Sequence, residues 1–256
     1  MTKEEVLKYS STPLSLGSNP IPPTAHRFMN REHLYIIYKT DWDALRKVVP
    51  EPLELLDEPL VRFEMMRMPI ATGYGDYTEC GQAIPVVCNG VEGEYLHQMY
   101  LDNFEAMASG REAHAYPKKP GHPEFYIDDN TVVGTLDYGR SHPFRIANAT
   151  MTYKYYPLDE AEALRQMTEP TYMLKLLPGY DESKGPRIAE LIVAQTDPKD
   201  VEIIEAWTGD ARLQLFDHVK CPMNDLPVRE IVSCSHIKCN LTLGFPKVVY
   251  DYLQQK

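Results

Sequence analysis

The chain has 256 residues, of which 43% are hydrophobic and 25% are charged, the composition of a globular protein rather than a disordered one. It has 26 Lys and Arg residues against 37 Asp and Glu, and its formal net charge of −11 disfavours nucleic acid and anionic membranes as partners. The 21 prolines and 17 tyrosines disfavour a helical bundle, because proline interrupts helices and tyrosine favours strands.

The first third of the chain predicts an arm, a strand and a short helix. Residues 1–30 are polar and rich in proline, so we expect a surface or interface arm. Residues 33–39 predict a strand, and Thr40 or Asp41 predicts the N-cap of a helix that ends before Pro50.

The next segment predicts two strands joined by a tight turn, after an isolated strand at residues 61–68. Apolar runs between residues 83 and 101 flank Asn89-Gly90, a dipeptide typical of two-residue hairpins. Asn103 predicts the N-cap of a helical turn that Gly110 ends.

The remaining sequence predicts one amphipathic helix, at residues 158–167, among many strands. The runs typical of strands are residues 131–136, 144–155, 171–177, 188–195, 201–207, 212–216 and 228–243. About ten strands with short helices and no regular strand–helix alternation predict a mainly β (α+β) single domain over residues 1–256, built as a partly closed antiparallel β-barrel.

Cysteine usage indicates a reducing compartment. The five cysteines are an odd number without the spacing of a disulfide framework, and the N-terminus lacks the apolar run of a secretory signal, so we expect free thiols and a cytoplasmic protein. Cys234, His236 and Cys239 could suggest a metal site. In a strand, however, Cys239 points away from the other two, so we expect no metal.

Two charged features could carry chemistry, although an adjacent pair of lysines is usually a solvated surface pair and a strand glutamate can equally face solvent. Lys118-Lys119 lies between prolines in a chain that is short of positive charge. Glu79 precedes an apolar strand, and Glu64 would share one strand face with Arg62 and Met66. Composition does not decide whether that face points inward or to solvent.

The sequence resembles the acetoacetate decarboxylase family in several blocks that occur in the same order, from about residue 10 to Leu253. These blocks include Asn30-Arg-Glu32, Asp57-Glu-Pro-Leu-Val-Arg-Phe-Glu64, Gly81-Gln-Ala-Ile-Pro85, Tyr100-Leu-Asp-Asn103, Ala115-Tyr-Pro-Lys-Lys119, Val133-Gly-Thr-Leu-Asp-Tyr-Gly139, Glu205-Ala-Trp-Thr-Gly209 and Arg212-Leu-Gln-Leu-Phe-Asp-His218.

The resemblance implies a cone-like β-barrel in a large homo-oligomer, a dodecamer. It also implies decarboxylation of acetoacetate to acetone and CO2 without a cofactor. Lys118 matches the family's Schiff-base lysine, and Lys119 matches the neighbour linked to its lowered pKa. The positions that match polar residues of the family's pocket are Arg31, Glu64, Glu79 and Tyr116.

The chemistry explains why such residues are needed. Loss of CO2 leaves an electron pair, which an iminium formed by a neutral amine can accept. A lysine with a pKa of about 10.4 is protonated at pH 7, and acetoacetate decarboxylase is itself the usual example of an enzyme that activates one by burial or a neighbouring cation. In an extended backbone Lys118 and Lys119 point to opposite faces, so we predict that burial dominates.

We predict that Arg31 holds the substrate carboxylate and that Glu79 and Glu64 orient Arg31 or relay protons. Two alternatives remain. A Schiff-base aldolase or dehydratase relative would act on a larger keto acid and release no CO2 from acetoacetate. A non-catalytic barrel that binds a small acidic ligand would form no adduct that borohydride can trap.

Overall fold

The computed structural model describes residues 2–7, 25–141 and 143–254. Most of the predicted arm over residues 1–30 therefore lies outside the described residues. Within it the structure describes the short helix α1 (Lys3–Val6) and the start of β1 (His26–Lys39), which begins seven residues before the predicted strand.

Twelve strands form one large sheet, and four form a smaller one. The path of the large sheet runs through β10 (Tyr156–Pro157), β13 (Val201–Thr208), β15 (Glu230–Leu243), β1, β3 (Leu60–Ala71), β4 (Gly75–Cys88), β5 (Val91–Leu101), β11 (Thr171–Pro178), β12 (Pro186–Ala194) and β16 (Lys247–Asp251). Two short strands lie off this path, β2 (Glu54–Leu55) on β4 and β6 (Lys118–Pro120) on β5. The small sheet has the order β14 (Ala211–Leu215), β9 (Phe144–Thr152), β8 (Thr131–Tyr138) and β7 (His122–Asp128).

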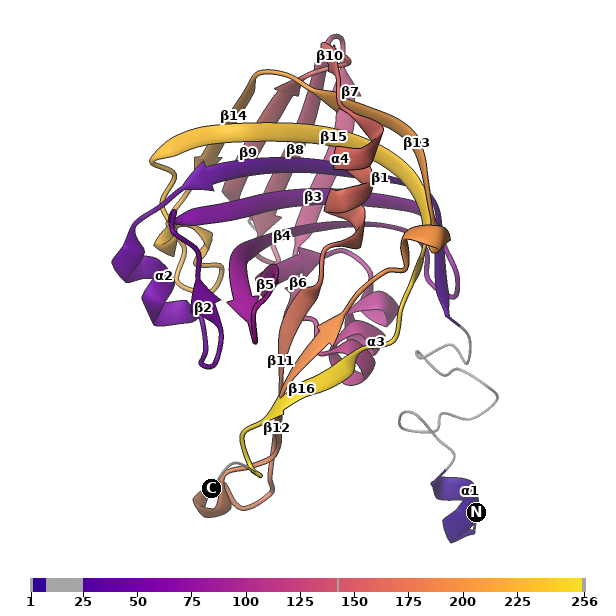
Figure 1. The fold of residues 1–256 in the computed structure, drawn as a ribbon, viewed down its shortest axis with the longest axis vertical. Helices are drawn as coiled ribbons and strands as arrows, with labels where there is room; N and C mark the ends of the chain where they lie inside the picture. The colour runs from indigo at the N-terminus through magenta and orange to yellow at the C-terminus, as the bar shows by residue number, and fades with distance from the viewer. Residues whose placement is uncertain (1, 8–24, 142, 255–256) are drawn as a thin grey trace.

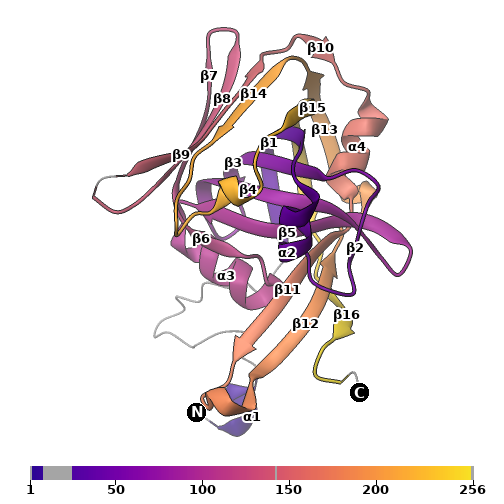
Figure 2. The same ribbon diagram turned by 90° about the vertical axis from the view of Figure 1, so that its left-hand side faces the viewer.

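The mainly β architecture is confirmed, but the sheets do not close into a barrel. In the described part of the chain, β10 and β16 end the path of the large sheet without pairing with each other. The second edge of β5 is divided between two parallel partners, because β11 pairs with residues 94–95 and β6 with residues 99–101. The ribbon of β11, β12 and β16 therefore leaves the curved sheet (Figures 1 and 2).

The two faces of the large sheet carry two separate clusters of buried side chains. The strands of the small sheet run behind β1 and β3 and cross them steeply (Figure 1). Phe63 and Met65 of β3 are fully buried in the core that includes Val132 and Leu136 of β8. The residues that alternate with them, such as Met66, belong to a second cluster on the opposite face, as the period of two predicts.

The predicted hairpin is confirmed. Asn89 and Gly90 connect β4 to β5 with φ values of 50° and 78°, the left-handed backbone that a tight hairpin turn requires. The helix α2 (Trp42–Val48) follows Asp41 as predicted, but the Asp41 carboxylate does not cap it. That carboxylate pairs with Arg229 at 2.7 Å from Nη2 to Oδ2.

The prediction that Gly110 ends a helical turn was wrong. The helix α3 (Phe104–His114) begins at the predicted Asn103 cap but continues to Ala115, which has a φ of 58°. Gly110 lies inside α3, where a methyl group on its Cα would lie 2.7 Å from Cδ of Lys118. The glycine is therefore required by close approach of a neighbouring side chain rather than by a turn.

The amphipathic helix predicted at residues 158–167 is α4 (Glu160–Thr168), which begins after Asp159 and ends before Pro170. It is tied to β15 by a hydrogen bond of 2.7 Å from Ser235 Oγ to Gln166 Oε1. Short 3-10 turns occur at Glu182–Lys184, Pro198–Asp200 and Met223–Asp225. Across the described ranges, no helix is long and apolar enough to cross a membrane.

Candidate active site

A cavity of ≈ 100 Å³ lies on the face of the large sheet that points away from the small sheet. Its floor comes from β1, β3, β4 and β5, and Gln166 and Met167 at the end of α4 contribute to its wall. Seven charged side chains line it: Arg31, Arg62, Glu64, Glu79, Glu94, Lys118 and Glu169. Five of the six predicted site residues, namely Arg31, Glu64, Glu79, Tyr116 and Lys118, therefore meet in one cavity.

Lys118 reaches the cavity because of the chain reversal after α3. Ala115 ends the helix, and β6 then pairs Lys118 with Met99 of β5. The lysine side chain passes under α3 against Gly110, and its Nζ lies 3.4 Å from the carbonyl oxygen of Ala106. Only 6% of Lys118 is exposed, as the sequence-based hypothesis of a buried amine requires.

The amine of Lys118 lies 2.5 Å from Oε1 of Glu79, which is 2% exposed. Burial destabilises an ammonium, whereas a carboxylate at this distance stabilises it. The sequence-based argument weighed burial against Lys119 and did not include this contact. The ring centroids of Tyr116 and Tyr77 lie 5.2 Å and 5.9 Å from Nζ and complete the surroundings of the amine.

Lys119 lies outside the cavity, on the opposite face of β6, as extended backbone predicts. Its side chain is exposed, and its Nζ lies 6.0 Å from the ring centroid of Tyr100. Burial, together with the charge of Lys119, lowers the pKa of His97 to about 4. The charge of Lys119 therefore acts on at least one group that does not line the cavity.

Arg31 is turned into the cavity by an irregularity in β1. Asn30 has a φ of 53°, and the register with β15 shifts between Phe28 and Arg31. Such bulges re-aim side chains near functional sites. The Arg31 guanidinium lies 2.9 Å from Met66 Sδ through Nη2 and 4.9 Å from the Phe28 ring centroid.

Arg31 carries an unneutralised charge. No carboxylate of the described residues lies within 4.0 Å of its guanidinium, in contrast to Arg62. Burial lowers the pKa of Arg31, but the nearby Tyr35, Tyr77 and Glu79 outweigh it and raise the pKa. A permanently charged, unpaired guanidinium is suited to receive a ligand carboxylate.

Glu64 lies over Gly81, whose missing side chain leaves space for its carboxylate: a methyl group there would lie 3.0 Å from Oε1. Its Oε2 accepts a hydrogen bond of 3.1 Å from Arg62 Nη2. Burial raises the pKa of Glu64, and the charges of Arg62 and Arg31 oppose that shift. The face of β3 that carries Arg62, Glu64 and Met66 therefore points into the protein, a question that composition left open.

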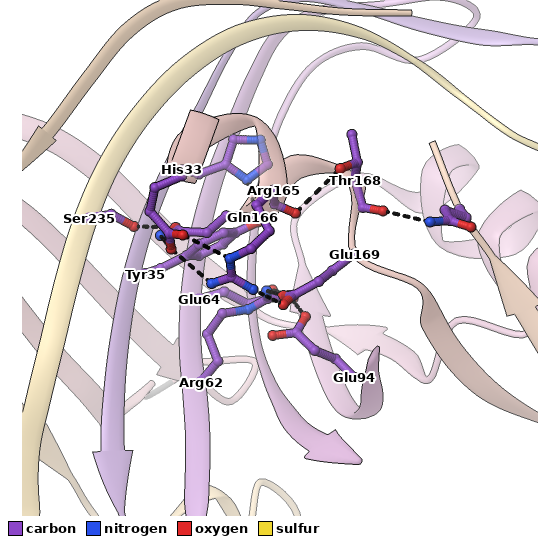
Figure 3. A network of polar contacts seen from close by, with 12 residues as sticks. His33, Tyr35, Arg62, Glu64, Glu94, Arg165, Gln166, Thr168, Glu169 and Ser235 are labelled. Atoms are coloured by element: carbon purple, nitrogen blue, oxygen red, sulfur yellow. Dashed lines mark hydrogen bonds and ion pairs between the residues drawn. The ribbon is translucent and has the colours of Figure 1, made fainter. Parts of the chain in front are cut away.

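Sequence reasoning missed Glu94 and Glu169 as members of the site. Both pair with Arg62, Glu169 with a distance of 3.8 Å from Nη1 to Oε2 (Figure 3). Burial raises the pKa of Glu94 to about 8, although Arg62 opposes the shift. Glu94 could have been suspected from the sequence, because a glutamate inside the apolar strand after Asn89-Gly90 needs a buried partner. Glu169 gave no such signal, because it follows a helix more than 70 residues later in the chain.

The cysteines do not line this cavity. All five cysteines are buried free thiols. Cys234 donates to the carbonyl oxygen of Gly209 at 2.9 Å, whereas Cys239 lies 3.7 Å from Met167 Sδ, so the two thiols point to different surroundings. Within the residues that the structure covers, no group of three or more His, Cys, Asp or Glu side chains could hold a metal ion.

Comparisons with known proteins agree with these features. A family model described as acetoacetate decarboxylase matches residues 11–253. An acetoacetate decarboxylase of Clostridium botulinum is 59% identical over 255 residues, which is 100% of both chains. A solved structure of an acetoacetate decarboxylase has a TM-score of 0.92 at 57% identity and covers 99% of this chain and 100% of its own. Another, from Legionella pneumophila, has a TM-score of 0.87 at 40% identity and covers 95% and 94%.

Proposed function

This chain belongs to the acetoacetate decarboxylase family, and from that membership we propose that it converts acetoacetate to acetone and CO2 through a Schiff base on Lys118. The observation that carries the proposal is one cavity that holds a buried amine, its carboxylate partner and an unpaired guanidinium. The resemblance implies that no cofactor is added, and the proposed reaction is that of a carboxy-lyase.

Binding comes first in the proposed reaction. The substrate carboxylate pairs with Arg31, which brings the ketone carbon toward Nζ of Lys118. Glu79 at 2.5 Å is placed to take the ammonium proton, so that the amine becomes neutral at the moment of attack. This transfer converts a buried ion pair into two neutral groups, so it leaves no uncompensated charge in the desolvated cavity.

The neutral amine adds to the ketone, and loss of water gives an iminium. The bond between C1 and C2 then breaks, CO2 leaves, and the electron pair moves into an enamine. Protonation at C2 regenerates an iminium, and water hydrolyses it to acetone and the free amine. Glu79 can take and return the protons that the nitrogen loses and gains when the amine adds to the ketone and is later released, because it touches that nitrogen.

Arg31 and Glu64 have opposite effects on the substrate carboxylate. Arg31 attracts it, and too tight a grip would stabilise the ground state and slow the loss of CO2. The negative charge of Glu64 weakens that grip, and Arg62 holds Glu64 in place at 3.1 Å. We therefore assign Arg31 and Tyr116 to substrate binding, Lys118 and Glu79 to the chemistry, and Glu64 to tuning the carboxylate. Lys119 has a supporting role outside the cavity.

One experiment tests the core of this proposal. Acetoacetate is added with borohydride, and CO2 release and the mass of the tryptic peptides are measured in parallel samples. We expect a reduced adduct on Lys118 in the wild type, none in Lys118→Met, and an adduct still on Lys118 in Lys119→Gln. Adduct formation without CO2 release would favour an aldolase or dehydratase, and absence of an adduct would favour a binding protein.

We also propose that one domain spans residues 1–256 and that the chain forms a large homo-oligomer, a dodecamer, as the family resemblance implies. Exposed apolar side chains on the ribbon support contacts between copies, including Leu176, Leu177 and Val248. The five buried free thiols support a reducing, cytoplasmic setting.

A further inference from the structure

The register of the large sheet arranges the cavity residues in rows. Met66 of β3 lies opposite Glu79 of β4, and this row also holds the Lys118 amine. The next row on the same face contains Glu64 opposite Gly81, and the one after it contains Arg62. Residues two apart on a strand lie about 7 Å apart, so the cavity leads from the amine toward Arg62.

The proposed function orients the substrate within these rows, and the inference rests on it. When the C1 carboxylate pairs with Arg31 and C3 is bonded to Lys118, the C4 methyl group must point toward a different part of the cavity wall. The row on the other side of the amine is filled by Met68 and Tyr77, which are 0% and 4% exposed. The methyl group therefore faces Glu64 and the cavity beyond it.

The far end of the cavity contains one guanidinium and three carboxylates. Arg62 pairs with Glu64, Glu94 and Glu169, and Figure 3 shows its side chain among them. Arg31, at the opposite end, has no such partner within the described ranges. The two ends of the cavity therefore differ: Arg31 at one end can bind a ligand carboxylate, whereas Arg62 at the other end is already paired with carboxylates of the protein.

We propose that Glu94 and Glu169 are specificity-determining residues that, by saturating Arg62, exclude keto acids with a second carboxylate beyond C4. A monocarboxylic β-keto acid with a neutral tail brings no second charge to this end of the cavity and can pack against its apolar residues, such as Leu96 and Met99. A dicarboxylic β-keto acid would place its second anion among carboxylates, and like charges at close range cost enough to reject a ligand.

The ionisation of Glu94 gives this role a pH dependence. Glu94 faces Arg62 and Glu64 from β3, Tyr35 from β1, and Glu169 and Arg165 from the end of α4. Burial raises the pKa of Glu94 to about 8, so Glu94 carries its full negative charge only above that pH, whereas Glu64 and Glu169 also pair with Arg62. Its own negative charge is added as the pH rises through 8, so exclusion strengthens with pH.

The test compares enzyme-dependent CO2 release from acetoacetate, 3-oxopentanedioate and 3-oxohexanoate, near pH 7 and near pH 9. The readout is kcat/KM for the diacid divided by kcat/KM for the neutral-tailed acid, because a general loss of structure lowers both alike. In the wild type we expect a ratio of about 1/100 or less that falls further near pH 9.

Glu94→Gln should raise this kcat/KM ratio about tenfold near pH 9 and remove the pH dependence of the ratio. Glu169→Gln should raise the ratio at both pH values.

Glu160→Gln is the matched control, since it removes one exposed carboxylate of α4 that does not line the cavity. It should leave the ratio at the wild-type value. A wild-type ratio near one, or a wild-type ratio in both cavity variants, would overturn the proposal; if Glu94→Gln does not fold, Glu169→Gln decides alone. Failure of the wild type to release CO2 from acetoacetate is a separate result, because it would reject the proposed function itself.

Discussion

At the scale of single residues, the pair formed by Lys118 and Glu79 is the contact on which we expect both stability and the proposed chemistry to depend. Both side chains are more than nine-tenths buried and lie 2.5 Å apart. Removing one member of a buried ion pair leaves the other charge without compensation, which typically costs about 3–5 kcal/mol, whereas replacing both members is much less damaging.

We therefore expect Lys118→Met to abolish decarboxylation and to lower the free energy of unfolding by about 3 kcal/mol or more. The double variant Lys118→Met/Glu79→Gln should recover most of that loss while remaining inactive, because no buried charge is then left without its partner. Urea unfolding of both variants and the wild type measures this. If Lys118→Met alone were as stable as the wild type, Lys118 and Glu79 would both be neutral in the folded protein.

His114 is the second residue whose burial has a measurable consequence. It is 2% exposed and stacks on Tyr116, with ring centroids 5.8 Å apart. Burial, with the charges of His26 and Lys118, lowers its pKa to about 4. The folded protein then binds fewer protons than the unfolded chain between pH 6.5 and pH 4, so this residue lowers stability as the pH falls through that range and adds no further loss below it.

For His114 alone the loss between pH 7 and pH 5 is about 2 kcal/mol. We expect His114→Phe, which keeps an aromatic ring in the stack, to reduce the acid dependence of unfolding by about that amount. Urea midpoints at both pH values give the difference. If the variant lost as much stability between pH 7 and pH 5 as the wild type, the acid sensitivity would belong to other groups. His97 is one such group, because its pKa is also lowered to about 4.

At the scale of elements, α3 is built to cover the lysine rather than to maximise its own helicity. A glycine inside a helix costs about 1 kcal/mol relative to alanine, and Gly110 accepts that cost because Lys118 Cδ and Nζ lie where its side chain would be. The helix and the strand β6 therefore form one unit that fixes the amine.

We expect Gly110→Ala to displace the amine and to lower kcat for acetoacetate by at least about tenfold, a scale that geometric misplacement of this size can reach. The helix itself would gain propensity, so stability should change much less than activity. Glu112→Ala, an exposed change on the same helix, is the control and should retain activity. Equal activity of Gly110→Ala and wild type would show that the lysine side chain can move without loss.

At the scale of the whole molecule, the ribbon of β11, β12 and β16 leaves the body of the protein (Figure 2). Several of its apolar side chains are exposed. Leu176 and Leu177 are adjacent in β11 and so point to opposite faces, yet they are 59% and 51% exposed. Because apolar side chains are exposed on both faces of this ribbon, we expect it to contact other copies of the chain in the proposed oligomer.

Leu176→Asp should therefore yield a smaller particle than the wild type in size-exclusion chromatography with light scattering. A charge in an apolar interface is not compensated by a partner, so the assembly loses stability. Val219→Asp introduces the same charge at a residue that is 94% exposed and lies outside the ribbon, and it should leave the particle mass unchanged. Identical masses for all three proteins would move the subunit contacts to another surface.

The sequence alone determined most of the long strands and which residues share one face of a strand. Local rules were sufficient for these, since a period of two places Glu64 beside Arg62, and Asn89-Gly90 fixes a hairpin through its own backbone. The same alternation correctly separated Lys118 from Lys119. The tertiary structure alone decided the openness of the sheet, because the shared edge of β5 depends on strands far apart in the chain. It also decided that Glu79 touches Lys118 and that Glu94 and Glu169 surround Arg62, since charges from separate elements meet only when the chain has folded.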